Sequence, residues 1–132
     1  MPLYWKIDPA DRLMVVTAEG MVVREEVDRM LDDMVAKRAL GYRKLFDGTD
    51  GDTAMDPTEL LALGSRMRTL HRRGTMGPLA VIVPAGKWEI IARVLGVLAA
   101  ARRPMRMFKT AASARRWLDA REPVGPAAGT GR

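Results

Sequence analysis

The pattern of hydrophobic and polar positions in the first third of the chain predicts a β-hairpin followed by a helix. Leu3–Asp8 and Leu13–Glu19 are short runs of strand-forming residues, and the turn residues of Pro9–Arg12 separate them. Gly20 is expected to end the second strand. Within Val22–Leu40 the apolar residues recur at helical spacing, with acidic residues near the beginning and a glycine beyond the end.

The rest of the chain alternates between short apolar runs and helical periods. Arg43–Asp47 predicts a third strand, and the glycines and acids of residues 48–55 predict an irregular loop after it. Asp56–Arg73 begins with DPTE, which combines an N-cap, a helix-starting proline and a capping box, and it predicts a second helix. Leu79–Val83 is an unbroken apolar run, typical of a strand buried on both faces. Three further elements are a helix over Lys87–Arg102, a strand over Met105–Lys109 and a helix over Ala111–Ala120.

This order of elements predicts the fold class. We expect an α/β, single-domain fold with a mixed, mostly parallel five-stranded sheet and four helices in the order ββαβαβαβα. The domain should occupy residues 1–120. Residues 121–132 have no periodicity and are rich in Gly, Pro and Ala, so we expect a disordered C-terminal tail there.

The composition of the chain limits the cellular compartments that suit it and the kinds of chemistry that it can perform. The chain of 132 residues contains no cysteine, which excludes disulfides and thiolate chemistry and suits a reducing compartment. The opening residues lack the pattern of a signal peptide, and Trp88–Ala101 is too short and too charged to cross a bilayer. We therefore expect a cytoplasmic protein without a transmembrane segment.

Charge is distributed unevenly along the chain. Residues 1–59 carry a net charge of −5 and residues 60–132 a net charge of +11. Three explanations of this asymmetry are open: an ordinary solvated surface, an anionic partner, or head-to-tail self-association. The arginines are spread over three predicted helices and aromatic residues are few, so we expect no specific binding of nucleic acid.

Reactive groups are too sparse to predict an enzyme. His71 is the only histidine, and Ser65, six positions earlier on the same predicted helix, does not face it. No glycine-rich phosphate loop is present. We predict no catalytic residues and no cofactor, and an enzyme that uses the acidic loop is kept as the least favoured hypothesis.

The stretch Tyr42–Glu59 is where we expect a site. In an open α/β sheet, sites form where strands end and the next helices begin. This stretch carries four aspartates whose oxygens could meet a cation: Asp47, Asp50, Asp52 and Asp56. Their spacing does not match a calcium loop, so we interpret them as turn formers and an N-cap and predict no metal site.

At this point the chain resembles a known family. Four features carry the resemblance: Glu19-Gly20 at the end of the hairpin, RKLFD over Arg43–Asp47, LAVIV over Leu79–Val83, and MFKTAASARRWL over Met107–Leu118. In this order they resemble the STAS-like, anti-sigma-factor-antagonist-like fold of small bacterial proteins, which is shared in outline with CRAL-TRIO lipid-exchange domains. The resemblance covers about residues 3–119.

The resemblance implies a regulatory site after the third strand. In phosphorylatable members, a kinase modifies a serine or threonine there and so controls binding to a regulatory protein. This chain has no serine in that loop, and its hydroxyl groups are Thr49, Thr53 and Thr58. Thr58 would lie in the first helical turn, where the helix dipole favours a phosphate but the neighbouring aspartates oppose it. A phosphorylation site and a simple helix-start residue are both open.

Two functions follow from the residues and the resemblance. The first is a non-enzymatic regulatory or protein-interaction module that forms a homodimer. The alternative is a carrier or sensor of a lipid or other small apolar ligand, which ten methionines and the apolar helix over Lys87–Arg102 also suit. One stripe of that helix is the expected dimer or ligand face: Ile90, Val94, Val97 and Ala101.

Overall fold

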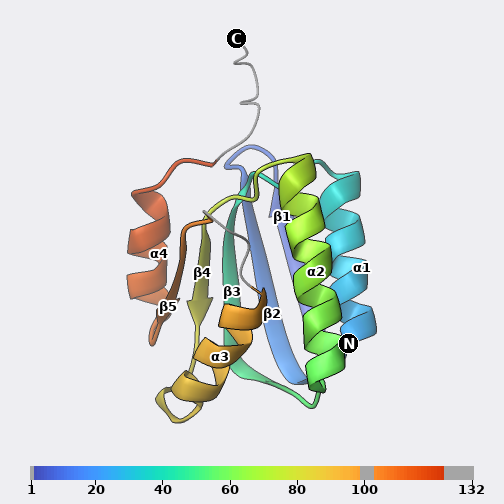
Figure 1. The fold of residues 1–132 in the computed structure, drawn as a ribbon. Coiled ribbons are helices and arrows are strands. Elements are labelled where there is room, and N and C mark those ends of the chain that lie inside the picture. Colours follow the sequence, from blue (N-terminus) through green and yellow to red (C-terminus); the bar gives the residue numbers. More distant parts are fainter. Residues whose placement is uncertain (1, 99–102, 124–132) are drawn as a thin grey trace.

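A computed structural model describes residues 2–98 and 103–123, which form one sheet with helices on both faces (Figure 1). The strands are β1 (Leu3–Asp8), β2 (Leu13–Val22), β3 (Arg43–Thr53), β4 (Leu79–Ile82) and β5 (Met105–Phe108). The helices are α1 (Arg24–Ala36), α2 (Pro57–Arg73), α3 (Trp88–Leu98) and α4 (Ala111–Asp119), with a short 3-10 turn, η1 (Ala85–Lys87), before α3. The predicted α/β class and the order ββαβαβαβα are confirmed.

The five strands lie in the order β1-β2-β3-β4-β5. β1 pairs with β2 in antiparallel register, and every other neighbouring pair is parallel. The parallel connections run through helices, as crossover connections require. The helices therefore begin at the edge of the sheet where β2, β3 and β4 end.

The helices divide the core into two layers. α1, α2 and α3 lie on one face of the sheet, and α4 alone lies on the other face, over β3, β4 and β5 (Figure 1). The larger core joins α1 and α2 to the inward side chains of β1 and β2, including Met14, Leu31 and Leu63. The smaller core joins α4 to Leu45, Ala80 and Ile82.

The third strand is longer than its sequence predicts. β3 continues past Asp47 to Thr53, so the expectation of an irregular loop over residues 48–53 is wrong. A bulge shifts the pairing with β2 after Asp47, and β3 then pairs again from Asp50 to Thr53. Gly51 lies in this second part. The residue there is glycine because a Cβ atom would come within 2.5 Å of the Cβ atom of Ala18. The glycine allows close approach of two strands and does not mark a turn.

Three other predicted boundaries are wrong. Gly20 does not end the second strand, since β2 runs through it to Val22 with a φ of +80° at the glycine. α1 begins at Arg24 because Val22 is still paired with Thr53, and it ends at Ala36, well before Leu40. Beyond the end of the helix, Arg38 adopts a left-handed conformation with φ of +57°, which prevents the helix from continuing.

The remaining elements lie where the sequence places them, within a residue at most of their ends. α2 begins with the capping box of Asp56 and Glu59, whose side chains and backbone N–H groups bond each other. Residues 99–102, where the third helix was expected to end, lie outside the described residues. Residues 124–132, most of the expected disordered tail, also lie outside them.

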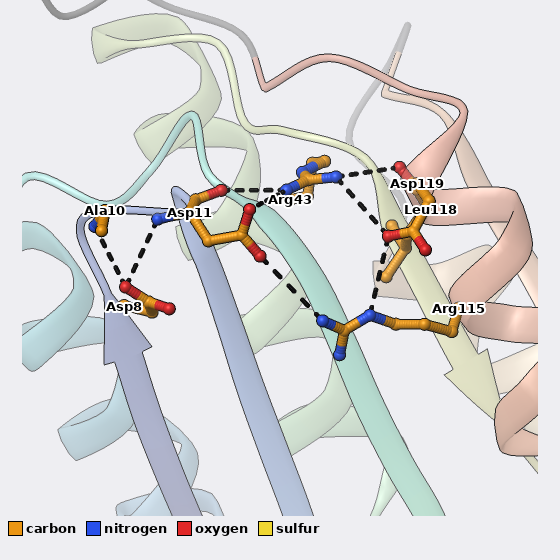
Figure 2. A network of polar contacts seen from close by, with 7 residues as sticks. All are labelled: Asp8, Ala10, Asp11, Arg43, Arg115, Leu118 and Asp119. Atoms are coloured by element: carbon orange, nitrogen blue, oxygen red, sulfur yellow. Dashed lines mark hydrogen bonds and ion pairs between the residues drawn. The ribbon is translucent and has the colours of Figure 1, made fainter.

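Arg43 joins three elements at the start of β3 (Figure 2). Its Nη2 group donates to the Asp11 backbone oxygen at 2.9 Å and to Asp11 Oδ1 at 3.1 Å, in the turn between β1 and β2. Its Nη1 group donates to the Leu118 backbone oxygen at the end of α4. Arg115 lies beside this buried guanidinium and pairs with Asp11 and Asp119 at the surface. The network holds α4 against the sheet.

Candidate ligand cavity

A cavity of about 190 Å³ lies between the sheet and helices α1, α2 and α3. Strands β2 to β5 form its floor, and α1, α2 and α3 form its other walls. Seven of the lining residues belong to the stretch Tyr42–Glu59: Lys44, Phe46, Gly48, Gly51, Asp52, Thr53 and Met55. The cavity therefore lies on the inner side of the stretch in which we expected a site.

The wall of the cavity is mainly apolar and rich in methionine. Six of the ten methionines line it: Met30, Met34, Met55, Met67, Met76 and Met105. Methionine side chains are unbranched and polarizable, and they adapt to apolar surfaces of different shapes. A partly enclosed cavity with a mainly apolar wall suits a small apolar molecule. The lining thus suits an apolar ligand and offers little to a polar one.

Lys44 provides one of the few charges in the cavity wall. Its side chain is almost fully buried, and its Nζ group donates to the backbone oxygens of Ala39, Leu40 and Tyr42 at 3.1, 2.6 and 2.8 Å. These three bonds use all three donors of an ammonium group. Burial, and then the nearby Arg103 guanidinium, lower the pKa of Lys44 well below its ordinary value, whereas the three backbone oxygens around Nζ favour the charged form.

Arg103 is the second cation of the wall and lies at the same end as Lys44. Its Nε group donates to the Gly77 oxygen at 2.9 Å, and the Gly77 N–H donates to the Leu40 oxygen that Lys44 also uses. Burial lowers the pKa of Arg103 to about 10, so it stays charged at neutral pH. In the part of the chain that the structure describes, no carboxylate pairs with Arg103.

The opposite end of the cavity lies where β3 ends. Gly51, Asp52 and Thr53 line this end. Lys87, in the turn before α3, donates from Nζ to the Gly51 oxygen at 2.8 Å and lies 3.6 Å from Asp52 Oδ2. This contact ties the turn before α3 to the end of β3, so α3 is held over the cavity at that end.

The three candidate threonines occupy different environments. Thr53 lines the cavity, and its Oγ1 group donates to the Val22 oxygen at 2.8 Å and accepts from the Met55 N–H. Thr49 is exposed on the bulge and donates to Asp47 Oδ1 at 2.7 Å. Thr58 is exposed in the first turn of α2. Thr49 and Thr58 are thus exposed, whereas the Thr53 hydroxyl bonds across to the end of β2.

The four aspartates have separate structural partners. Asp47 accepts from the backbone and side chain of Thr49, and Asp56 caps α2. Asp52 faces Lys87, and Asp50 is exposed on β3. Within residues 2–98 and 103–123, no group of three or more His, Cys, Asp or Glu side chains is placed to hold a metal ion.

The expected face of α3 divides in two. Val94 lines the cavity together with Ile91 and Leu95, whereas Ile90 is 62% exposed. The side chain of Val97 and the whole of Ala101 lie outside the described residues. The helix therefore presents Val94 to the interior and Ile90 to the outside.

A second, larger hollow of about 770 Å³ is an open groove between α3 and the edge strand β5. Trp88, Phe108 and Lys109 are among its lining residues.

Comparison with known proteins identifies the fold. No protein-family model and no curated protein sequence matches the chain. Four chains of solved structures match it. One of them is an uncharacterized protein from the DUF3478 family with a SpoIIAA-like fold, from Shewanella loihica PV-4. It shares 18% sequence identity with a TM-score of 0.61, over 88% of this chain and 93% of that chain. The chain has a SpoIIAA-like fold. The expected STAS-like resemblance is thereby confirmed at the level of the fold.

Lys44 and Arg103 were not predicted as site residues. The alternation of the strand RKLFD does place Lys44 on the same face as Phe46, opposite Leu45, and a lysine in a central strand is a signal of a buried charge. Arg103 gave no such signal, because it precedes a proline in what reads as a helix end. Only the packing of residues 76–77 against it places it at the cavity.

Proposed function

We propose that the chain is a non-enzymatic binding module that holds a small apolar ligand, as a carrier or a sensor. The methionine-rich cavity between the sheet and α1, α2 and α3 is the observation that carries this proposal. The expected cytoplasmic location stays a prediction. No helix among the described residues is long and apolar enough to cross a membrane.

The apolar lining of the cavity supports the proposal. A ligand that filled the cavity would remove the facing methionine, valine and leucine side chains from water, and burial of apolar surface contributes about 25 cal/mol per Å². An apolar ligand that binds the folded chain would therefore stabilise it.

Substitutions on α3 test the proposal with a matched control. Val94→Phe would fill part of the cavity, and Ile90→Phe would place the same ring on the exposed side of the same helix, one turn earlier. In titrations with the neutral apolar dye N-phenylnaphthylamine, we expect Val94→Phe to weaken binding by about tenfold or more. Ile90→Phe should bind as the wild type does. Circular dichroism checks that both variants fold.

Equal dye binding by the wild type and by folded Val94→Phe would contradict a ligand site in this cavity. So would a wild-type protein that binds neither the dye nor a straight-chain alcohol such as decanol.

A regulatory or protein-interaction role is the second candidate, and exposed apolar residues favour it. Met21, Val23, Leu61 and Ile90 are all between 44% and 62% exposed, and each lies at the end of β2 or at the beginning of a helix. They therefore share the edge of the sheet where the parallel strands end. Exposed apolar residues that share one edge of a domain are typical of an interaction surface. A homodimer through this edge is the form of this role that we propose.

A further inference from the structure

The charges in the cavity wall are not balanced. Lys44 and Arg103 line the same end of the cavity, where Leu40 and Gly77 link them through their backbone groups. Among the described residues, neither cation has a carboxylate partner. A buried ammonium next to a partly buried guanidinium, without a counter-ion, is costly. An anion at this end of the cavity would offset that cost.

The two cations offer different things to an anion. The three N–H donors of Lys44 are already used by backbone oxygens, so Lys44 contributes positive potential only. The guanidinium of Arg103 has five N–H donors. Within the described chain it uses one on the Gly77 oxygen and one on the Met76 sulfur at 3.7 Å. Three of its N–H groups therefore remain to donate to a ligand in the cavity that Arg103 lines.

We propose that the ligand of this cavity is a monocarboxylic acid with an apolar tail, whose carboxylate is bound by Arg103 in the field of Lys44. A single guanidinium fork matches a carboxylate in two parallel hydrogen bonds. A phosphate monoester carries close to two negative charges at neutral pH, whereas a carboxylate carries one, which the single positive charge of Arg103 balances. This inference rests on the proposed function, because it assigns the polar end of a ligand whose apolar part fills the same cavity.

The shape of the cavity agrees with an extended tail. Lys44 and Asp52 both line the cavity and lie eight positions apart on β3, so the cavity extends along the strand. Between the cationic end and the end at Asp52, the wall is formed mainly by methionine, valine and leucine side chains. An unbranched chain suits such a space.

A matched pair of ligands tests the inference on the wild-type protein. Decanoic acid and decanol have the same tail and differ in the charged group. We expect decanoate to displace N-phenylnaphthylamine at a concentration about 10- to 100-fold lower than decanol, the range of a charge-assisted hydrogen bond. Decyl phosphate distinguishes the two kinds of anion and should be weaker than decanoate.

Variants assign the effect to Arg103. Arg103→Met should lose the preference for decanoate and keep the binding of decanol. Arg93→Met removes an exposed arginine from α3 and should keep the preference. The wild-type comparison needs no variant, so it decides the inference even where Arg103→Met does not fold.

The outcomes separate the inference from the proposed function. Equal displacement by decanoate and decanol overturns the acidic ligand and leaves an apolar ligand standing. Stronger displacement by decyl phosphate overturns the carboxylate. A folded Arg103→Met protein that still prefers decanoate overturns the role of Arg103. Failure of the dye and of both decyl compounds to bind overturns the inference and the proposed function together.

Discussion

Gly51 allows β2 and β3 to lie close together near their carboxyl ends, where the cavity also ends. A Cβ atom at this position would lie 2.5 Å from the Cβ atom of Ala18, closer than two carbon atoms can pack. The backbone here is extended and pairs with Gly20 of β2. The need for glycine is therefore one of space between two strands.

Gly51→Ala should destabilise the protein by about 1 to 3 kcal/mol, because the added methyl group forces the strands apart. The double variant Ala18→Gly, Gly51→Ala moves the methyl group to the other strand and should recover most of the loss. Urea unfolding measures both. Gly86→Ala is the control, since a methyl group there meets no atom within 4 Å. A loss in the double variant as large as in Gly51→Ala would contradict the close-packing explanation.

Single residues also show where sequence reasoning reaches its limit. The alternation of apolar and polar residues can place Lys44 inside the domain. It cannot show that the three acceptors of its ammonium come from the loop of Ala39, Leu40 and Tyr42. The isolation of Arg103 from carboxylates depends on residues far away in the chain, so no local pattern could reveal it.

At the scale of elements, the types and order of helices and strands were predictable because local periodicity decides them. The predicted ends were wrong where a neighbouring strand decides them. β3 continues beyond Asp47 because β2 offers a partner as far as Val22, and that pairing is a long-range fact. The glycine-rich and acidic composition of residues 48–53 favours a loop only in the absence of that partner.

The contact of α4 with the sheet yields a second prediction. Arg43→Met should lower the free energy of unfolding by about 2 to 3 kcal/mol, since it removes buried, charge-assisted hydrogen bonds to the turn after β1 and to α4. Arg115→Met is the control. Its guanidinium shares Asp11 and Asp119 but is 47% exposed, so the loss should stay below about 1 kcal/mol.

Urea unfolding compares the two variants under one condition. A larger loss in Arg115→Met than in Arg43→Met would contradict the view that the buried guanidinium holds the network together (Figure 2).

At the scale of the whole molecule, folding mixes the acidic and basic halves of the chain. Arg66 of α2 pairs with Asp28 and Asp32 of α1, and Lys87 pairs with Asp52. Arg115 and Asp11 likewise join the two halves. Several basic residues of the second half thus meet acids within the domain. The charge asymmetry of the sequence is therefore weaker support for a separate anionic partner than it first indicates.

The cavity is also a property of the whole molecule. Its wall combines four strands and three helices, and no segment of the sequence carries its signal alone. The SpoIIAA-like fold was predictable from the order of elements. The order of elements does not determine whether the space between the helices and the sheet is a packed core or a cavity, because the side-chain volumes decide that.

Native mass spectrometry of protein purified without detergent is the most direct test of the proposed function. We expect each subunit to carry extra mass that is released on denaturation and that corresponds to a small apolar acid. The same spectrum counts the subunits, and a dimer at micromolar concentration is expected for the interaction role, whereas a monomer would contradict it. A spectrum of the bare polypeptide, from a protein that also fails to take up added decanoate and decanol, would contradict the central claim that the cavity is a ligand site.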